Sequence, residues 1–211
     1  QEEKAYQKEI KVDFDFLSPI DERLLAHNLM LPEQVIGRNL SIHTQKDGIP
    51  ELTDVRVALV SLEPRLVKGE PLHLRFRHQF YQLFVGNWDF SCADLGVLHS
   101  GDHPKDTLFA LKTLVKELHQ RNIFTIVVGG EQENTLGMFR GLSGMNTYVN
   151  LTSIDARFDF GEPGILVSDD SYMSNIITEK PNNLKQFTNL GYQSYYIYQE
   201  ELDLMQKLFF D

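Results

Sequence analysis

Short apolar runs that alternate with amphipathic stretches constrain the fold of this chain more than any other feature. The runs expected to form strands are 55–60, 90–98, 123–128, 147–154 and 193–198. The stretches expected to form helices are 21–29, 72–85, 102–118, 134–140, 171–178 and 200–210. Strands that alternate with helices predict an α/β fold, in which helices cover both faces of a mainly parallel sheet as a three-layer sandwich.

The regular alternation begins only after turn-forming residues at Lys46–Pro50. We therefore divide the 211 residues into an N-terminal segment, 1–50, and one α/β domain, 51–211. A chain of this length is long enough to bury a substantial core.

Charge and hydropathy narrow the classes of partner. A net charge of -10 argues against binding to nucleic acid or to anionic membrane surfaces, because both attract basic proteins. No run approaches the roughly 20 apolar residues of a membrane span, and residues 1–11 lack the apolar core of a signal peptide. The single cysteine, Cys92, lies in an apolar run and is expected to be a buried thiol. We expect a cytoplasmic protein whose partner is a small molecule or another protein.

Two motifs follow expected strands, at the edge of a parallel sheet where ligands bind. The first is Gly129-Gly130-Glu131-Gln132-Glu133, and the second is Asp155-Ala156-Arg157-Phe158-Asp159. The glycine pair indicates either close approach of a ligand or a tight turn. Glu131 and Glu133 are candidates for an acid/base pair, although carboxylates at a helix start are the more ordinary reading.

Both motifs resemble signatures of the ureohydrolase superfamily, which includes arginase, agmatinase and formimidoylglutamase. The family patterns are Gly-Gly-Asp-His-Ser and Asp-Ala-His-x-Asp. Further stretches that are similar to the formimidoylglutamase-like branch are 93–96, 110–112, 158–163, 189–193 and 199–205. The resemblance runs from about Val55 to the end and implies an arginase-like fold. It also implies a site for two manganese ions, completed by a later Asp-x-Asp.

The metal-binding positions depart from the family pattern. Gln132 and Arg157 stand where the family has histidines, and no Asp-x-Asp follows Asp159. An amide oxygen is a poor ligand for a transition metal, and a guanidinium has no lone pair to donate. Asp155 and Asp159 are then either relict metal ligands or carboxylates paired with Arg157. We expect a degraded manganese site and no cofactor.

The chain ends at Asp211, where the family continues. We therefore expect a fold that lacks the C-terminal part of the family fold. The resulting unpaired strand edge would be covered by a further portion of the natural protein or by a homo-oligomer. The tyrosines of the run 192–198 are expected to serve core or interface packing.

Two hypotheses for function follow. In the first, the chain is a degenerate ureohydrolase that binds a ligand or partner in a crevice at Gly129, Gly130, Gln132 and Arg157. In the second, it hydrolyses a formimino or amidino C–N bond, such as that of formiminoglutamate. Its manganese ions would then be held by Glu131, Glu133, Asp155, Asp159 and residues beyond Asp211. A purely structural role is the third reading.

Overall fold

The strands form two hydrogen-bonded sheets in the computed structural model, which describes residues 14–64, 69–87, 91–144, 147–164 and 166–211. The first sheet has the order β1-β4-β3-β5, with β2 also paired to β4, and the second is β6-β7. Every strand pair is parallel except β1 with β4. The strands are β1 (Leu17–Ser18), β2 (Ser41–Ile42), β3 (Val57–Leu62), β4 (Cys92–Leu98), β5 (Phe124–Gly129), β6 (Val149–Ile154) and β7 (Leu184–Leu190). The predicted α/β class with a mainly parallel sheet is confirmed.

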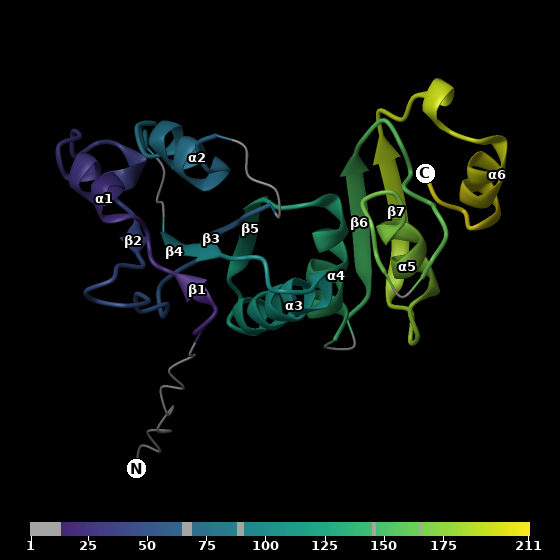
Figure 1. The fold of residues 1–211 in the computed structure, drawn as a ribbon, viewed down its shortest axis with the longest axis horizontal. Coiled ribbons are helices and arrows are strands. Elements are labelled where there is room, and N and C mark those ends of the chain that lie inside the picture. The colour runs from purple at the N-terminus through teal and green to yellow at the C-terminus, as the bar shows by residue number, and fades with distance from the viewer. Residues whose placement is uncertain (1–13, 65–68, 88–90, 145–146, 165) are drawn as a thin grey trace, which may run out of the picture.

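Helices lie on both sides of the first sheet, with α1 and α2 above it and α3 below it in Figure 1, whereas α4 packs against α3 and stands between β5 and β6. In the second half, α5 lies against β6 and β7, and α6 lies beyond β7. The α-helices are α1 (Glu22–Leu29), α2 (Leu72–Phe80), α3 (Pro104–Gln120), α4 (Thr135–Ser143), α5 (Tyr172–Thr178) and α6 (Gln199–Lys207). The 3-10 turns are η1 (Ile36–Arg38), η2 (Gln132–Asn134) and η3 (Ser194–Tyr196). No helix within the described ranges is both long enough and apolar enough to span a membrane.

One strand was misplaced by the sequence pattern. The strand expected at 193–198 is wrong, because this run forms η3 and its extended flanks. Tyr195 and Tyr198 are 94% and 77% exposed, so the predicted core packing is wrong for them. The Tyr192 ring, in contrast, lies 5.0 Å from the ring of buried Phe158, and interface packing stays a prediction. The strand β7 was not predicted, because its buried side chains include the polar Asn189 as well as Phe187 and therefore do not form an apolar run.

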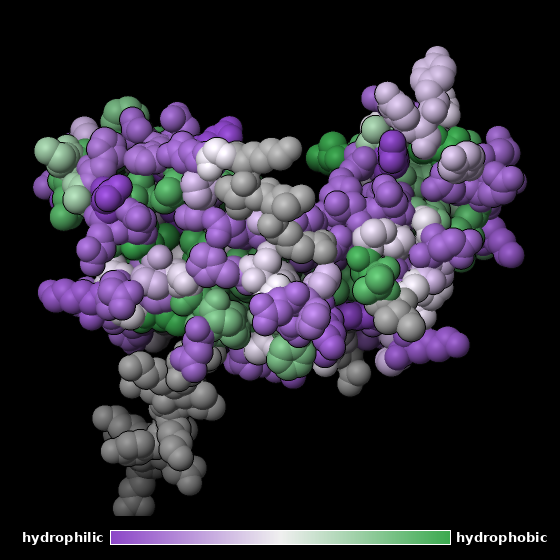
Figure 2. Space-filling model, viewed as in Figure 1, coloured by the Kyte–Doolittle hydropathy of each residue, from purple (hydrophilic) through white to green (hydrophobic). Residues whose placement is uncertain are grey.

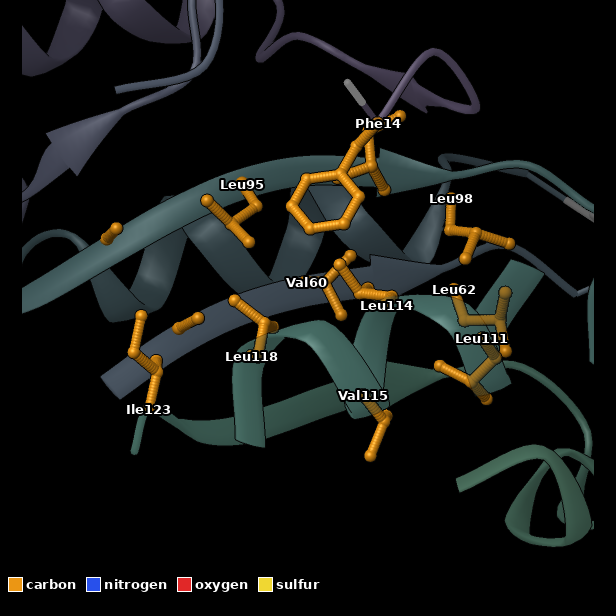
Figure 3. Packing of buried hydrophobic residues seen from close by; sticks show 13 residues of the cluster. Phe14, Val60, Leu62, Leu95, Leu98, Leu111, Leu114, Val115, Leu118 and Ile123 are labelled. Atoms are coloured by element: carbon orange, nitrogen blue, oxygen red, sulfur yellow. The ribbon is translucent and has the colours of Figure 1, made fainter. Parts of the chain in front are cut away.

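The first core lies between the sheet and α3 (Figure 3). Val60 and Leu62 of β3 and Leu95 of β4 point toward the leucines of α3. These three strand residues are at most 1% exposed. Pro104 is the first residue of α3, where a missing N–H costs nothing. An apolar stripe forms most of the buried face of this helix: Leu108, Leu111, Leu114, Val115 and Leu118.

The opposite face of the sheet carries a buried ion pair that attaches α2. Arg77 of α2 donates from Nε and Nη2 to the two carboxylate oxygens of Asp94 on β4, at 2.8 and 2.7 Å, and both side chains are fully buried. The guanidinium also donates to Ser61 Oγ of β3 and to the Gly96 carbonyl. The Tyr81 hydroxyl donates to Asp94 at 2.9 Å. The pair is therefore surrounded by the additional hydrogen bonds that a buried charge requires.

The described part of the N-terminal segment pairs with the same sheet. β1 and β2 lie along one edge of β4, at its carboxyl and amino ends respectively. Leu24 of α1 packs with Ile20 and Tyr81. The division at residue 50 remains a prediction.

The buried cysteine also agrees with its predicted role. Cys92 is 5% exposed at the start of β4. Burial, and secondarily the charge of Asp94, raises the pKa of its thiol to about 12, so the thiol stays protonated at neutral pH. A reactive thiolate is not available there.

The facing edges of β5 and β6 each lack a strand partner within the described ranges, since β5 pairs with β3 and β6 with β7. Large apolar side chains on these strands are exposed, including Phe124 at 69% and Ile154 at 86%. The molecular surface in Figure 2 is otherwise mostly hydrophilic, and its upper outline is hollowed between the half with α2 and the half with β6 and β7. What covers these edges remains a prediction, either a further portion of the protein or a second copy.

Replacing Arg77 by methionine is expected to lower the free energy of unfolding by roughly 3 to 5 kcal/mol, because the Asp94 carboxylate is left buried without its cation. Urea unfolding followed by circular dichroism measures this loss. The matched control is Arg75→Met on the exposed side of α2, which should cost well under 1 kcal/mol. Equal losses in the two variants would contradict a structural role for the Arg77–Asp94 pair.

Candidate functional site

A pocket of about 380 Å³ lies beyond the carboxyl end of β6 and joins the two sequence motifs. Gln132 of the first motif and Asp155, Arg157 and Asp159 of the second line it. The remaining lining residues are Ala156, Asp170 and Tyr196. The pocket falls in the size range of small-molecule sites, and most of its lining residues carry polar groups.

Asp155 directly follows β6 and has both carboxylate oxygens engaged. The Gln132 amide donates from Nε2 to Oδ2 at 2.6 Å, which ties η2 to the end of β6. The backbone N–H of Arg157 donates to Oδ1 at 3.0 Å, a local turn typical of aspartate. Gln132 therefore donates a hydrogen bond at the position where the motif that it resembles has a histidine.

Arg157 lines the pocket beside Asp170 and Tyr196. Its Nη1 lies 3.6 Å from Asp170 Oδ1, and the guanidinium carbon lies 5.7 Å from the centre of the Tyr196 ring. The ion pair that the structure describes is therefore with Asp170, not with the motif carboxylates. Both partners are more than half exposed, so the pair contributes little stability and the cation stays accessible to an incoming anion.

The backbone around Arg157 is held by neighbouring elements. Buried Asn189 of β7 donates from Nδ2 to the Arg157 carbonyl at 2.8 Å and to Ser153 Oγ at 2.9 Å. The Gln193 N–H donates to the Ala156 carbonyl at 2.9 Å, which brings η3 and its Tyr196 to the pocket. The lining residues thus come from four separate stretches of chain.

Asp159 is the buried carboxyl group of the pocket. It is 6% exposed, has φ of 55°, and its Oδ2 has no hydrogen-bond partner in the described structure. Burial raises the pKa of this carboxyl group to about 6, and the charges of Asp155 and Asp170 add to the effect. A hydrogen bond from Tyr172 and the charge of Arg157 act in the opposite direction. Asp159 therefore titrates near pH 6, above the usual range of an aspartate.

The other residues named from the first motif lie outside the pocket lining. Gly129 and Gly130 have φ of 94° and 78°, and a Cβ on Gly129 would lie 2.6 Å from the Leu62 carbonyl oxygen. This contact with β3 explains the glycine pair as a tight turn. Glu133 is 4% exposed, and its backbone N–H donates to Asp169 at 3.2 Å. Glu131 precedes η2 and its carbonyl accepts from Asn134.

Three residues near the site were missed by the sequence analysis: Asp169, Asp170 and Tyr172. They reach the pocket region because the Gly161 N–H donates to the Asp170 carbonyl at 2.8 Å, which folds the following loop back over the second motif. Gly161 is needed for this contact, since a Cβ there would lie 2.7 Å from that carbonyl oxygen. No periodicity in this segment signals the arrangement.

A second polar cluster lies at the carboxyl ends of β3 and β4. The two carboxylate oxygens of Glu63 each contact a histidine Nδ1 at 3.0 Å, one from His73 and one from His99. Burial, opposed by the Glu63 charge, lowers the pKa of His73. Among the residues that the structure describes, neither this cluster nor any other group of three or more His, Cys, Asp or Glu side chains is arranged to hold a metal ion.

Comparison with known proteins identifies one family. The model of the Arginase family matches residues 62–208. No curated protein sequence matches the chain.

Solved structures share the fold at low sequence identity. Formiminoglutamase from Trypanosoma cruzi, solved with Mn2+2, has a TM-score of 0.65 and 14% identity over 75% of this chain and 59% of that chain. Formimidoylglutamase from Bacillus subtilis has a TM-score of 0.62 and 10% identity over 89% and 64%. Arginase from Medicago truncatula has a TM-score of 0.58 and 14% identity over 74% and 55%. The chain thus spans about 60% of the length of these proteins.

The raised pKa of Asp159 predicts a pH-dependent stability. The unfolded chain loses this proton near pH 3.8 and the folded chain near pH 6, so ionisation of Asp159 disfavours folding increasingly as the pH rises from about 4 to 6. Asp159→Asn removes this penalty, and asparagine tolerates the positive φ. The free energy of unfolding of the variant should be roughly 1 to 3 kcal/mol higher than that of wild type between pH 4 and pH 7.

Urea unfolding at a series of pH values measures this gain. The control is Asp102→Asn, in an exposed loop, which should show no such pH-dependent difference. A constant difference between Asp159→Asn and wild type across the range would contradict the assigned pKa.

Proposed function

Because the chain belongs to the Arginase family, we propose that it is a ureohydrolase-like domain that binds a ligand in the pocket beyond β6 without dinuclear metal chemistry. The observation that carries this proposal is the hydrogen bond from Gln132 Nε2 to Asp155 Oδ2 at 2.6 Å. It occupies a carboxylate oxygen that a metal pair would need.

The donor set does not fit two manganese ions. Asp155 already accepts two hydrogen bonds, and Arg157 brings a fixed positive charge to the pocket where a cation would have to enter. Asp159 alone keeps a buried oxygen without a partner. One open carboxylate next to a guanidinium favours an organic ligand over a pair of divalent ions.

The charges of the pocket indicate what the ligand carries. Arg157 is exposed and can bind a carboxylate or another planar anion in a bidentate manner. Asp159 and Asp170 offer acceptors to a cationic nitrogen group a short distance away. A small polar molecule with both kinds of group, or a protein segment that presents them, is the partner that we propose.

Hydrolysis of a formimino or amidino C–N bond is the alternative function. It is supported by the fold that the chain shares with the formiminoglutamase from T. cruzi, solved with Mn2+2, and by the unpartnered Oδ2 of Asp159. Turnover would require metal ligands in addition to Asp155 and Asp159. Metal content therefore separates the two functions.

Wild type is expected to retain only substoichiometric manganese after incubation with Mn²⁺ and dialysis. The double variant Gln132→His/Arg157→His should retain more, because it adds two imidazole ligands and removes the repelling cation. Elemental analysis measures the metal, and thermal denaturation shows that both proteins are folded.

Stoichiometric manganese in the wild type, close to two ions per chain, would overturn the proposal, and release of ammonia or formamide from formiminoglutamate would then establish the alternative. Arg121→His, far from the pocket lining, is the matched control for non-specific metal binding by an added histidine. It should hold no more manganese than wild type.

A further inference from the structure

A second pocket, of about 470 Å³, lies at the opposite end of β6 and β7 from the proposed ligand site. It is formed by one face of α3, the C-terminal turn of α4 and the segment between α5 and β7. Its lining residues are Lys105, Leu108, Phe109, Lys112, Arg140, Ser143, Gly144, Glu179, Lys180, Pro181 and Asn183.

The two pockets are separated by the length of β6. The lining segment 179–183 leads into the amino end of β7, whereas Asp155 of the first pocket follows the carboxyl end of β6. A strand of six residues is about 20 Å long. The second pocket is therefore a distinct site.

The lining of the second pocket is strongly positive. Four cations, Lys105, Lys112, Arg140 and Lys180, stand against one carboxylate, Glu179. This concentration is unusual in a chain whose net charge is -10. A concave surface lined by one sign of charge attracts counter-charged ligands.

Helix dipoles do not account for these cations. Arg140 lies in the last turn of α4, where a positive charge is favourable. Lys105, in contrast, is the second residue of α3, at the helix end that disfavours a cation. Lys112 lies seven residues further on, so both lysines project from the same face of α3. The positions of Lys105 and Lys112 therefore suit a negatively charged ligand and are not explained by the helix dipole.

The walls of this pocket are held in place by close contacts. Gly137 and Gly141 let α4 approach α3, since a Cβ on Gly141 would lie 2.8 Å from the Val115 Cβ. Arg140 donates from Nε to Glu179 Oε1 at 3.0 Å, and Nη2 of the same guanidinium lies 2.5 Å from that oxygen. Asn183 donates to the Ser143 carbonyl at 2.8 Å. A site fixed in this way loses little entropy when a ligand binds.

Apolar side chains complete the lining. Leu108 is buried at its base, whereas the Phe109 ring is 68% exposed and Pro181 lies in the facing segment. An exposed aromatic ring beside lysines offers a stacking surface next to an anion site.

We propose that this second pocket binds a small phosphate ester, with the phosphate held by Lys105, Lys112 and Arg140 and a planar group packed on Phe109. A phosphate monoester carries nearly two negative charges at neutral pH and accepts several charge-assisted hydrogen bonds. It therefore matches a pocket with several cations better than a single carboxylate does.

Isothermal titration calorimetry at low ionic strength tests the proposal on the full chain, with inorganic pyrophosphate and adenosine monophosphate as probes. The test variant is Lys105→Gln/Lys112→Gln. The matched control is Lys116→Gln/Lys185→Gln, which removes two lysines outside the pocket and changes the net charge equally. Phe109→Ala is compared separately, and circular dichroism shows that all variants are folded.

We expect saturable one-to-one binding by wild type and the control, and binding weaker by about tenfold or more in the test variant. Phe109→Ala should weaken the binding of adenosine monophosphate but not the binding of pyrophosphate. Absence of saturable binding of both probes to wild type, or equal weakening in the control and the test variant, would overturn the phosphate site. An unchanged affinity of Phe109→Ala for adenosine monophosphate would overturn the stacking role of Phe109.

Discussion

The buried pair between Arg77 and Asp94 connects α2, β3 and β4 at one place, because the guanidinium also reaches Ser61 and the Gly96 carbonyl. The carboxyl ends of β3 and β4 are thereby fixed under α2. The parallel register then aligns Leu62 of β3 with Gly129 of β5. The position of the glycine turn, and of Gln132 after it, follows from this alignment. The pocket wall that contains Gln132 therefore begins at the end of a strand that pairs with β3, one of the two strands that Arg77 connects.

The two aspartates of the second motif have opposite environments although they are four residues apart. Both carboxylate oxygens of Asp155 accept hydrogen bonds, one from a side-chain amide and one from a backbone N–H, whereas Asp159 is buried with one oxygen unpartnered. Burial and neighbouring carboxylates therefore raise the pKa of Asp159 to about 6. A buried carboxyl group with one unpartnered oxygen destabilises the fold when ionised, and such a group at a pocket is typical of a functional position.

Sequence patterns predicted those helices and strands that their own run of residues is enough to identify. An amphipathic stretch indicated α3, and apolar runs indicated β3, β4 and β5. The two motifs were expected at one edge because parallel strands end there, and Gln132 and Asp155 are indeed in contact. Asp170 and Tyr196 were not foreseen, since they arrive through backbone hydrogen bonds of Gly161 and Gln193. The strand β7 was missed because buried Asn189 serves the Arg157 loop instead of an apolar core.

The same elements that bring the family motifs together also separate two chemically different pockets. At the carboxyl end of β6 the lining is acidic with one guanidinium, and at the amino ends of β6 and β7 it is basic with one carboxylate. Under the two proposals, each lining would attract a ligand of the opposite charge, and β6 and β7 would separate the two binding sites.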